Sequence, residues 1–137
     1  MSDKCIFCKI INGKLPSHTI FENDHSIAFL DINPINPGHV LVIPKKHYKT
    51  LSEMDESIAV ELFKTVMVVE KVVAESGCAG TNVLQNNGKQ AGQEIEHVHF
   101  HIVPRYPDDS IRFKYKKIRV SEEMMNYSLD YYKSKLT

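Results

Sequence analysis

The sequence predicts an α+β domain: an antiparallel five-stranded sheet, one long helix and short helices near the two ends. Five short segments rich in apolar and β-branched residues are each bounded by Gly, Pro, Asn or Asp, which is typical of strands. One longer stretch carries apolar residues at helical spacing. Because strands precede and follow this helix and do not alternate with helices, an antiparallel layer is favoured over βαβ units. A chain of 137 residues has the size of one domain.

The first half of the chain is expected to hold a short helix and three strands. These elements are, in order, a helix over 5–12, a hairpin of strands over 19–22 and 26–31, and a strand over 39–43. Gly13 is a plausible stop for the helix, and Asn23, Asp24 and His25 form the turn of the hairpin. The third strand is an apolar run closed by Pro44, too short for a helix and suited to burial.

The second half begins with the long helix, predicted over residues 55–76. Its apolar residues recur at helical spacing ahead of Gly77: Ile58, Leu62, Val66, Val69 and Val73. Two further strands are expected over 81–85 and 97–103, joined by a loop over 86–92, and a last helix over 121–135.

Composition excludes several classes of protein. Seventeen basic and seventeen acidic residues give a net charge of +0, so no long-range field favours nucleic acid or an anionic membrane as a partner. No apolar run approaches the roughly 18 residues that span a bilayer, and the N-terminus lacks a signal-peptide pattern. We therefore expect a cytoplasmic protein. Three cysteines in a reducing compartment favour metal binding or plain burial over a disulfide framework.

Three histidines, His97, His99 and His101, alternate with apolar residues in one predicted strand. Side chains at alternate positions share one face of a strand, so the three imidazoles are expected to point the same way. A single histidine is usually structural, but three in strict alternation predict a functional face. Two chemistries remain open from the residues alone: a catalytic zinc held by two of the imidazoles, or a middle histidine that acts as nucleophile.

The segment 97–103 resembles the histidine triad (HIT) motif, in which histidines alternate with apolar residues. Other residues that match the family in order and spacing are Phe7, Ile10, Leu15, Pro16, Phe29, Leu30, Asp31, Ile32, Pro37, Gly38, His39, Pro44, Lys45, Lys46, His47, Gly92 and Gln93. The resemblance covers residues 3 to about 106, whereas the segment from about 107 to 137 is variable in the family. It implies a single HIT domain over 1–137 that forms a homodimer.

The resemblance also implies an activity: cleavage of purine nucleoside phosphoramidates, or related nucleoside monophosphate conjugates, through a nucleotidyl-histidine intermediate. His99 would be the nucleophile, with the backbone carbonyl of His97 holding its tautomer. His101 and Gln93 would contact phosphate oxygens, and His39 matches the fourth active-site histidine of the family.

The same resemblance assigns the nucleotide-binding residues. Asp31 would accept both ribose hydroxyls, Asn86 would lie beside the phosphate, and an apolar slot would hold the base. The residues of that slot are Phe7, Ile10, Leu15, Phe29 and Ile32. On the residues alone, Asp31 is equally a strand-end carboxylate, Asn86 a turn residue and the apolar set ordinary core. Glu94 departs from one branch of the family, which has a serine there, so the leaving group stays open.

Cys5 and Cys8 form a CxxC motif whose two thiolates can reach one metal ion. Buried, reduced cysteines are the alternative. The resemblance implies that His47 and His97 complete a closed, structural zinc site, which leaves His99 and His101 for catalysis. Cys78 follows the long helix and is expected to pack.

Two other functions stay open. A dinucleoside polyphosphate hydrolase is suggested by Gln93 and by Pro104 and Arg105 after the triad, and a non-catalytic nucleotide-binding interaction protein is the third possibility. The family pairs its sheets near the long helix, so Val68 and Val72 are expected at a dimer interface.

Overall fold

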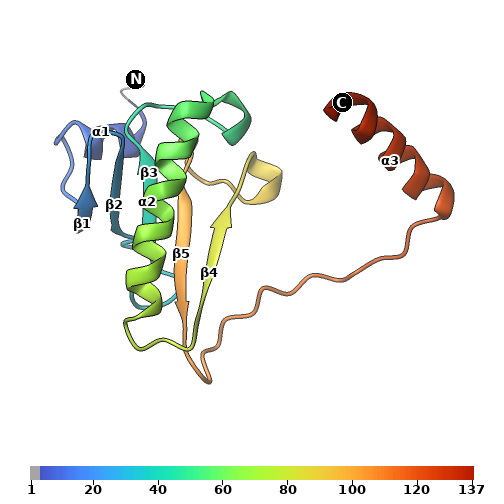
Figure 1. Ribbon diagram of the computed structural model, residues 1–137. Helices are drawn as coiled ribbons and strands as arrows, with labels where there is room; N and C mark the ends of the chain where they lie inside the picture. Colours follow the sequence, from blue (N-terminus) through green and yellow to red (C-terminus); the bar gives the residue numbers. More distant parts are fainter. Residues whose placement is uncertain (1–3) are drawn as a thin grey trace.

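The computed structural model describes residues 4–137 and has the predicted architecture (Figure 1). The elements in chain order are α1 (Ile6–Ile11), β1 (Thr19–Glu22), β2 (Ser26–Leu30), β3 (Val40–Pro44), a 3-10 turn (Leu51–Glu53), α2 (Glu56–Ala74), β4 (Gly80–Gln85), a second 3-10 turn (Lys89–Ala91), β5 (Phe100–Arg105) and α3 (Glu122–Leu136). The strands form one antiparallel five-stranded sheet in the order β1-β2-β3-β5-β4. The predicted fold class is confirmed.

The bounds of four strands differ from the prediction. β2 ends at Leu30 and not at residue 31, β4 begins at Gly80 and not at residue 81, and the differences in β3 and β5 bear on the site. β3 begins and ends one residue later than expected, so His39 lies just ahead of it. β5 begins at Phe100 and not at residue 97, because the backbone N–H of Val98 donates to the carbonyl of Tyr48 (2.8 Å) in the loop after β3. His97 and His99 therefore lie in an extended segment ahead of the strand.

The two faces of the sheet carry different layers, as the period-two alternation of strands requires (Figure 1). One face packs on α2 through a continuous buried core: Ala28, Val40, Val42, Leu62, Val66, Val69, Val73, Val98 and Ile102. The other face packs on α1 through a smaller cluster: Phe7, Ile27, Phe29, Leu41 and Ile43. His101 pairs in register with Leu41 on β3 and with Leu84 on β4, so its side chain lies on the α1 side. The short α1 leaves part of this face open.

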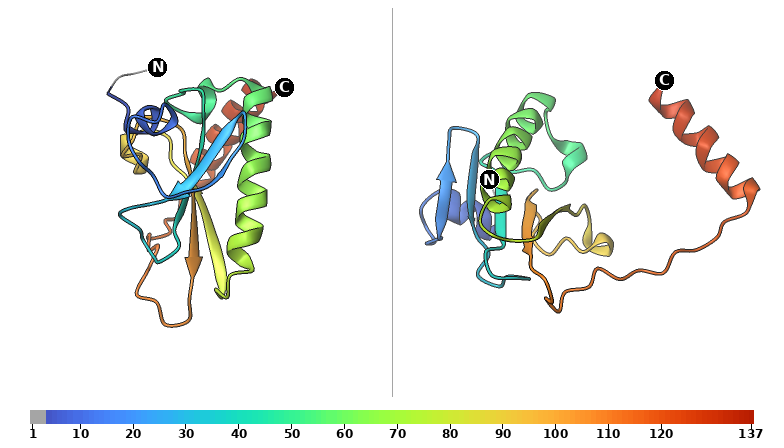
Figure 2. Two further views of the ribbon diagram at one scale, coloured as in Figure 1. Left: turned by 90° about the vertical axis from the view of Figure 1, so that its left-hand side faces the viewer. Right: turned by 60° about the horizontal axis from the view of Figure 1, so that its bottom comes forward.

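The C-terminal part of the chain extends away from the sheet. Residues 107–121 contain no helix or strand, and α3 stands apart from the remaining elements (Figures 1 and 2). The predicted last helix is confirmed, yet none of its residues is buried. Among residues 4–137, no helix has the length and apolar character needed to cross a membrane.

Candidate active site and metal centre

A cavity of about 570 Å³ opens on the α1 side of the sheet, within the size range of small-molecule sites. Its lining includes nine of the residues that were predicted to be catalytic or nucleotide-binding. The polar ones are Asp31, His39, Asn86, His99 and His101. The apolar ones are Phe7, Ile10, Phe29 and Ile32. Residues from α1, from the loop after β2 and from the triad segment therefore converge on one space.

Three nominated residues do not line this cavity: Leu15, Gln93 and His97. Gln93 differs most from the expectation, because its side-chain amide bonds to groups inside the protein. Its Oε1 accepts from the Gly88 N–H (2.7 Å), and its Nε2 donates to the carbonyls of Lys49 (2.7 Å) and Ile95 (3.0 Å). Gln93 thus ties together the loops around the site and has no hydrogen left for a phosphate. Leu15 is 38% exposed, and its chain neighbour Pro16 lines the cavity.

The orientation of His99 is set by a backbone group. Its Nδ1 lies 2.6 Å from the carbonyl oxygen of His97, which can only accept. The neutral imidazole must therefore carry its proton on Nδ1, and Nε2 keeps a lone pair. His99 is 6% exposed, and the ring of Phe7 packs edge-on against it at 5.1 Å between centroids.

Burial also keeps His99 neutral. Desolvation is the main cause that lowers its pKa, opposed by the hydrogen bond to His97 and by the charges of Asp31 and Glu94. A neutral imidazole with one exposed lone pair is a competent nucleophile near neutral pH.

His39 and His101 form a second imidazole pair at the floor of the cavity. Nε2 of His39 lies 2.9 Å from Nδ1 of His101, and the rings of His101 and His99 are 4.8 Å apart. Burial lowers the pKa of His39, and it lowers the pKa of His101 to about 4, with a further contribution from His99. The three imidazoles are therefore neutral together at physiological pH.

Asp31 supplies the carboxylate of the cavity. One oxygen accepts from the backbone N–H of Asn33 (2.9 Å), which closes an Asx turn after β2. The other lies 3.7 Å from Nδ1 of His39. That nitrogen also accepts from the Ile35 N–H at 3.0 Å, so it carries no proton and the contact with Asp31 is not an ion pair.

Several lining residues were not found from the sequence. Leu41 and Leu84 flank His101 through strand register, which no local pattern reveals. Ile35 comes from the loop after β2. Phe113 comes from the segment after β5, where it packs over the Arg105 guanidinium at 5.5 Å. The family resemblance ends before Phe113, so no sequence signal was available for it.

The four predicted metal ligands meet next to the cavity. The distances between donor atoms are 3.4 Å from Cys5 Sγ to His97 Nδ1, 3.3 Å from Cys8 Sγ to His47 Nδ1, 3.6 Å from Cys8 Sγ to His97 Nδ1 and 3.0 Å between the two Nδ1 atoms. Zn–S bonds of about 2.3 Å and Zn–N bonds of about 2.05 Å at tetrahedral angles place S and N about 3.5 Å apart and two N atoms about 3.3 Å apart. The donor set fits a metal ion of this kind.

The protonation of His97 also suits a ligand. Its Nε2 lies 2.9 Å from the carbonyl of Pro44 and must donate to it, so Nδ1 presents a lone pair to the cluster. Burial lowers the pKa of His97 to about 4, which keeps it neutral. Cys78 lies outside this cluster, and its thiol donates to the Val73 carbonyl at the end of α2 (3.3 Å).

Comparison with known proteins shows the family to which a chain with this fold and histidine site is similar. The model of the HIT domain family matches residues 12–108. The chain is 48% identical over 115 residues to an uncharacterized HIT-like protein of Methanocaldococcus jannaschii, covering 84% of this chain and 89% of that protein. It is 45% identical over 107 residues to an adenosine 5'-monophosphoramidase of Saccharomyces cerevisiae, covering 77% of this chain and 65% of the enzyme.

A solved structure extends the similarity to nearly the whole chain. The crystal structure of a HIT family member from Bacillus subtilis superimposes with a TM-score of 0.86 at 38% sequence identity. The match covers 96% of both chains, so the extended segment after β5 is similar as well as the sheet.

Proposed function

Because the chain belongs to the HIT domain family, we propose that it is a hydrolase of purine nucleoside phosphoramidates and related nucleoside monophosphate conjugates. The observation that carries the proposal is the lone pair on Nε2 of His99, which the His97 carbonyl enforces beside a nucleotide-sized cavity. The phosphoramidase of S. cerevisiae, a relative at 45% identity, supports this substrate class.

In the proposed reaction, Nε2 of His99 attacks the phosphorus atom, the P–N bond breaks, and the nitrogen, which has taken up a proton, leaves as a neutral amine. The proton is returned to the medium when water attacks in the second step. The imidazole becomes positively charged as the nucleotidyl-histidine forms, and its Nδ1–H remains on the His97 carbonyl, which stabilises that charge. Water then attacks the phosphorus, releases the nucleoside monophosphate and restores neutral His99. His101 lies 4.8 Å from His99 between ring centroids, within reach of the phosphate oxygens.

The remaining parts of the cavity suit a nucleoside monophosphate. The apolar walls formed by Phe7, Ile10, Phe29 and Ile32 are suited to stack on a purine base. Asp31 keeps one carboxylate oxygen that the Asn33 N–H does not use, and ribose hydroxyls are its natural donors. Asn86 also lines the cavity, and we assign it to the phosphate end.

Glu94 favours the phosphoramidase over the dinucleoside polyphosphate hydrolase. Its carboxylate lines the cavity and is close enough to raise the pKa of His99. A carboxylate at this position repels a departing polyphosphate and stabilises a phosphoramidate nitrogen that is protonated, and so positively charged, before the P–N bond breaks. We therefore assign Glu94 to the leaving-group side of the site.

One comparison tests the function. We expect the wild type to turn over an adenosine phosphoramidate faster than a diadenosine polyphosphate. Glu94→Gln should reduce the ratio of these two rates. His99→Ala should lose turnover while it still binds adenosine monophosphate, because the pocket belongs to other residues. Binding without turnover in the wild type would favour the non-catalytic interaction protein, and faster cleavage of the polyphosphate would favour the other hydrolase.

We also propose that Cys5, Cys8, His47 and His97 hold a structural zinc ion. A closed set of four protein ligands leaves no position for water, so this ion would stabilise the fold without taking part in catalysis. The ligands come from the start of α1, the loop after β3 and the segment ahead of β5. A metal there ties these three segments together around the cavity.

A homodimer is the third part of the proposal. The exposed surface of α2, including its two flanks, carries five apolar side chains: Val60, Phe63, Met67, Val68 and Val72. Contact with a second protein molecule would remove this apolar surface from water. In α3, exposed apolar residues such as Met124, Met125 and Leu129 also lack cover, and a 15-residue helix alone in water is marginal. A second copy of the chain would bury both surfaces.

A further inference from the structure

The β2–β3 loop, residues 32–38, controls the protonation pattern of the cavity through one backbone group. The N–H of Ile35 donates to Nδ1 of His39 at 3.0 Å. A backbone N–H can only donate, so Nδ1 of neutral His39 holds a lone pair and the ring proton lies on Nε2.

This arrangement decides the tautomer of the next imidazole. Nε2 of His39 lies 2.9 Å from Nδ1 of His101, and since Nε2 carries the proton, Nδ1 of His101 must accept. The proton of neutral His101 is then on Nε2, its second ring nitrogen. The cavity thus holds two neighbouring imidazoles of opposite tautomer: His99 offers a lone pair, and His101 offers an N–H.

The 32–38 loop is fastened to the end of β5 by side chains outside the cavity lining. Nδ2 of Asn36 donates to the carbonyl of Pro104 (2.9 Å) and to Oδ2 of Asp109 (3.1 Å). The carbonyl of Asn36 accepts from the His39 N–H at 3.1 Å. Asn36 is the neighbour of Ile35, so its position determines where the Ile35 N–H points.

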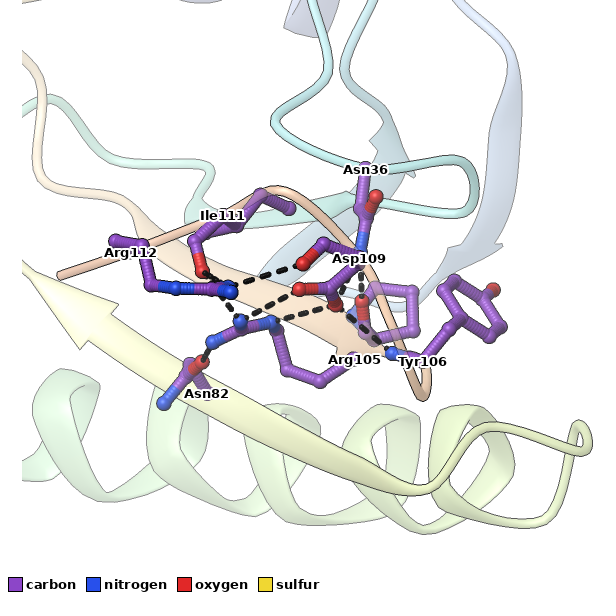
Figure 3. Close-up of polar contacts among 8 residues, drawn as sticks. Asn36, Asn82, Arg105, Tyr106, Asp109, Ile111 and Arg112 are labelled. Carbon is purple, nitrogen blue, oxygen red and sulfur yellow. Dashed lines mark hydrogen bonds and ion pairs between the residues drawn. The ribbon is translucent and has the colours of Figure 1, made fainter.

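Asp109 is in turn held rigidly (Figure 3). Arg105 grips both carboxylate oxygens, Nε to Oδ2 at 2.9 Å and Nη2 to Oδ1 at 2.8 Å, and the Tyr106 N–H adds a third bond at 2.9 Å. Asn82 on β4 accepts one further bond from Nη1 of Arg105 (2.9 Å), a nitrogen that takes no part in the pair with Asp109. A bidentate arginine–carboxylate pair has a defined geometry, which makes it a firm anchor for the loop.

We propose that Asn36, Arg105 and Asp109 are positioning residues, which hold the 32–38 loop in place. The Ile35 N–H of this loop then fixes the tautomer of His39, and His39 fixes that of His101. In this tautomer His101 presents an N–H to the bound nucleotide. The benefit to catalysis rests on the proposed hydrolase function. The tautomers themselves do not depend on it, because they follow from the hydrogen bonds alone.

The test uses the chain of 137 residues as purified, labelled with 15N, and two substitutions in the same cluster. Asn36→Ala removes the two side-chain bonds that Asn36 makes to Pro104 and Asp109, and it leaves the bond from the Tyr106 hydroxyl to the Pro37 carbonyl (3.1 Å) in place. Asn82→Ala is the matched control, because it removes a bond to Arg105 but touches no residue of the loop. The ring nitrogens of His39 and His101 are observed by long-range 1H–15N correlation, which distinguishes a protonated from an unprotonated nitrogen, and kcat and KM are measured with an adenosine phosphoramidate.

We expect the wild type and Asn82→Ala to show a protonated Nε2 and an unprotonated Nδ1 in both histidines. In Asn36→Ala these signals should move toward the averaged values of exchanging tautomers. If about one molecule in ten retains the competent tautomer, kcat falls about tenfold with little change in KM. Asp109→Asn, which places an NH2 group against donors, should act in the same direction and serves as the second variant if Asn36→Ala does not fold.

Unchanged tautomers in Asn36→Ala, or equal changes in Asn36→Ala and Asn82→Ala, would overturn the proposal and reduce the cluster to a stabilised turn. A wild type with the proton on Nδ1 of His101 would overturn it as well. If the tautomers respond as expected but no phosphoramidate is cleaved, the proposed function fails and the positioning role of the loop stands.

Discussion

Acid should destabilise this protein through His101, and the size of the effect follows from its burial. The folded state lowers the pKa of His101 from 6.5 to about 4, mainly by desolvation, with the nearby imidazoles His99 and His39 adding to it. Below pH 6.5 the His101 imidazole is protonated in the unfolded chain but stays neutral in the folded chain until the pH approaches 4. The free energy of unfolding therefore falls as the pH falls. The stability is fully present above pH 6.5 and is lost progressively toward pH 4.

At about 1.4 kcal/mol for each pKa unit, the complete effect is about 3 kcal/mol, and about 2 kcal/mol of it appears between pH 7 and pH 4.5. The assay is urea unfolding at both pH values for the wild type and for His101→Asn. The asparagine oxygen can still accept from Nε2 of His39 but does not titrate.

With an m-value of about 2 kcal/mol/M in urea, the wild type should lose about 1 M more of its unfolding midpoint than the variant does. Both proteins are measured at the same metal loading, so that loss of a metal ion in acid affects them equally. Equal pH dependence in the two proteins would refute the inference that buried, neutral His101 carries this term.

Three further predictions concern the metal, the assembly and the ribose. Wild-type protein purified without added metal should contain about one zinc per chain, and the Cys5→Ser, Cys8→Ser double mutant should contain little zinc. Removal of the metal with a chelator should lower the unfolding midpoint. If the chelator instead stops turnover at once in a protein that is still folded, the metal is catalytic. Met67→Glu, at a side chain 58% exposed, should convert a dimer into a folded monomer in sedimentation at micromolar concentration, and a monomeric wild type would refute the interface. Asp31→Asn should weaken adenosine monophosphate binding about tenfold or more and abolish any preference over the 2'-deoxy nucleotide; a preference that survives would remove Asp31 from the ribose.

The elements of the fold could be predicted because their signals are local. The helical spacing in α2 buries one face of that helix, whereas the continuous apolar runs of β2 and β3 bury both faces of these strands. Both patterns can be read in a short window of sequence. The start of β5 could not be found in this way, since the segment with His97 and His99 bonds to the loop at Tyr48 and only its side-chain alternation resembles a strand.

The sequence by itself determined which groups could do chemistry: the alternating imidazoles, the CxxC pair and the family order of Asp31 and Asn86. The sequence could not determine which groups from distant segments become hydrogen-bond partners of these residues. Only the tertiary structure brings Cys5 within 3.4 Å of His97 across 92 positions of the chain, and only it shows that the Gln93 amide is used up by backbone groups.

The same reason applies to the tautomers of the site. The proton of His99 is placed by the carbonyl of His97 and that of His39 by the N–H of Ile35. Every residue type except proline carries both of these backbone groups, so their presence in the sequence is no signal. Their direction is decided by the packing of loops, and it is this direction that makes one imidazole a nucleophile and its neighbour a donor.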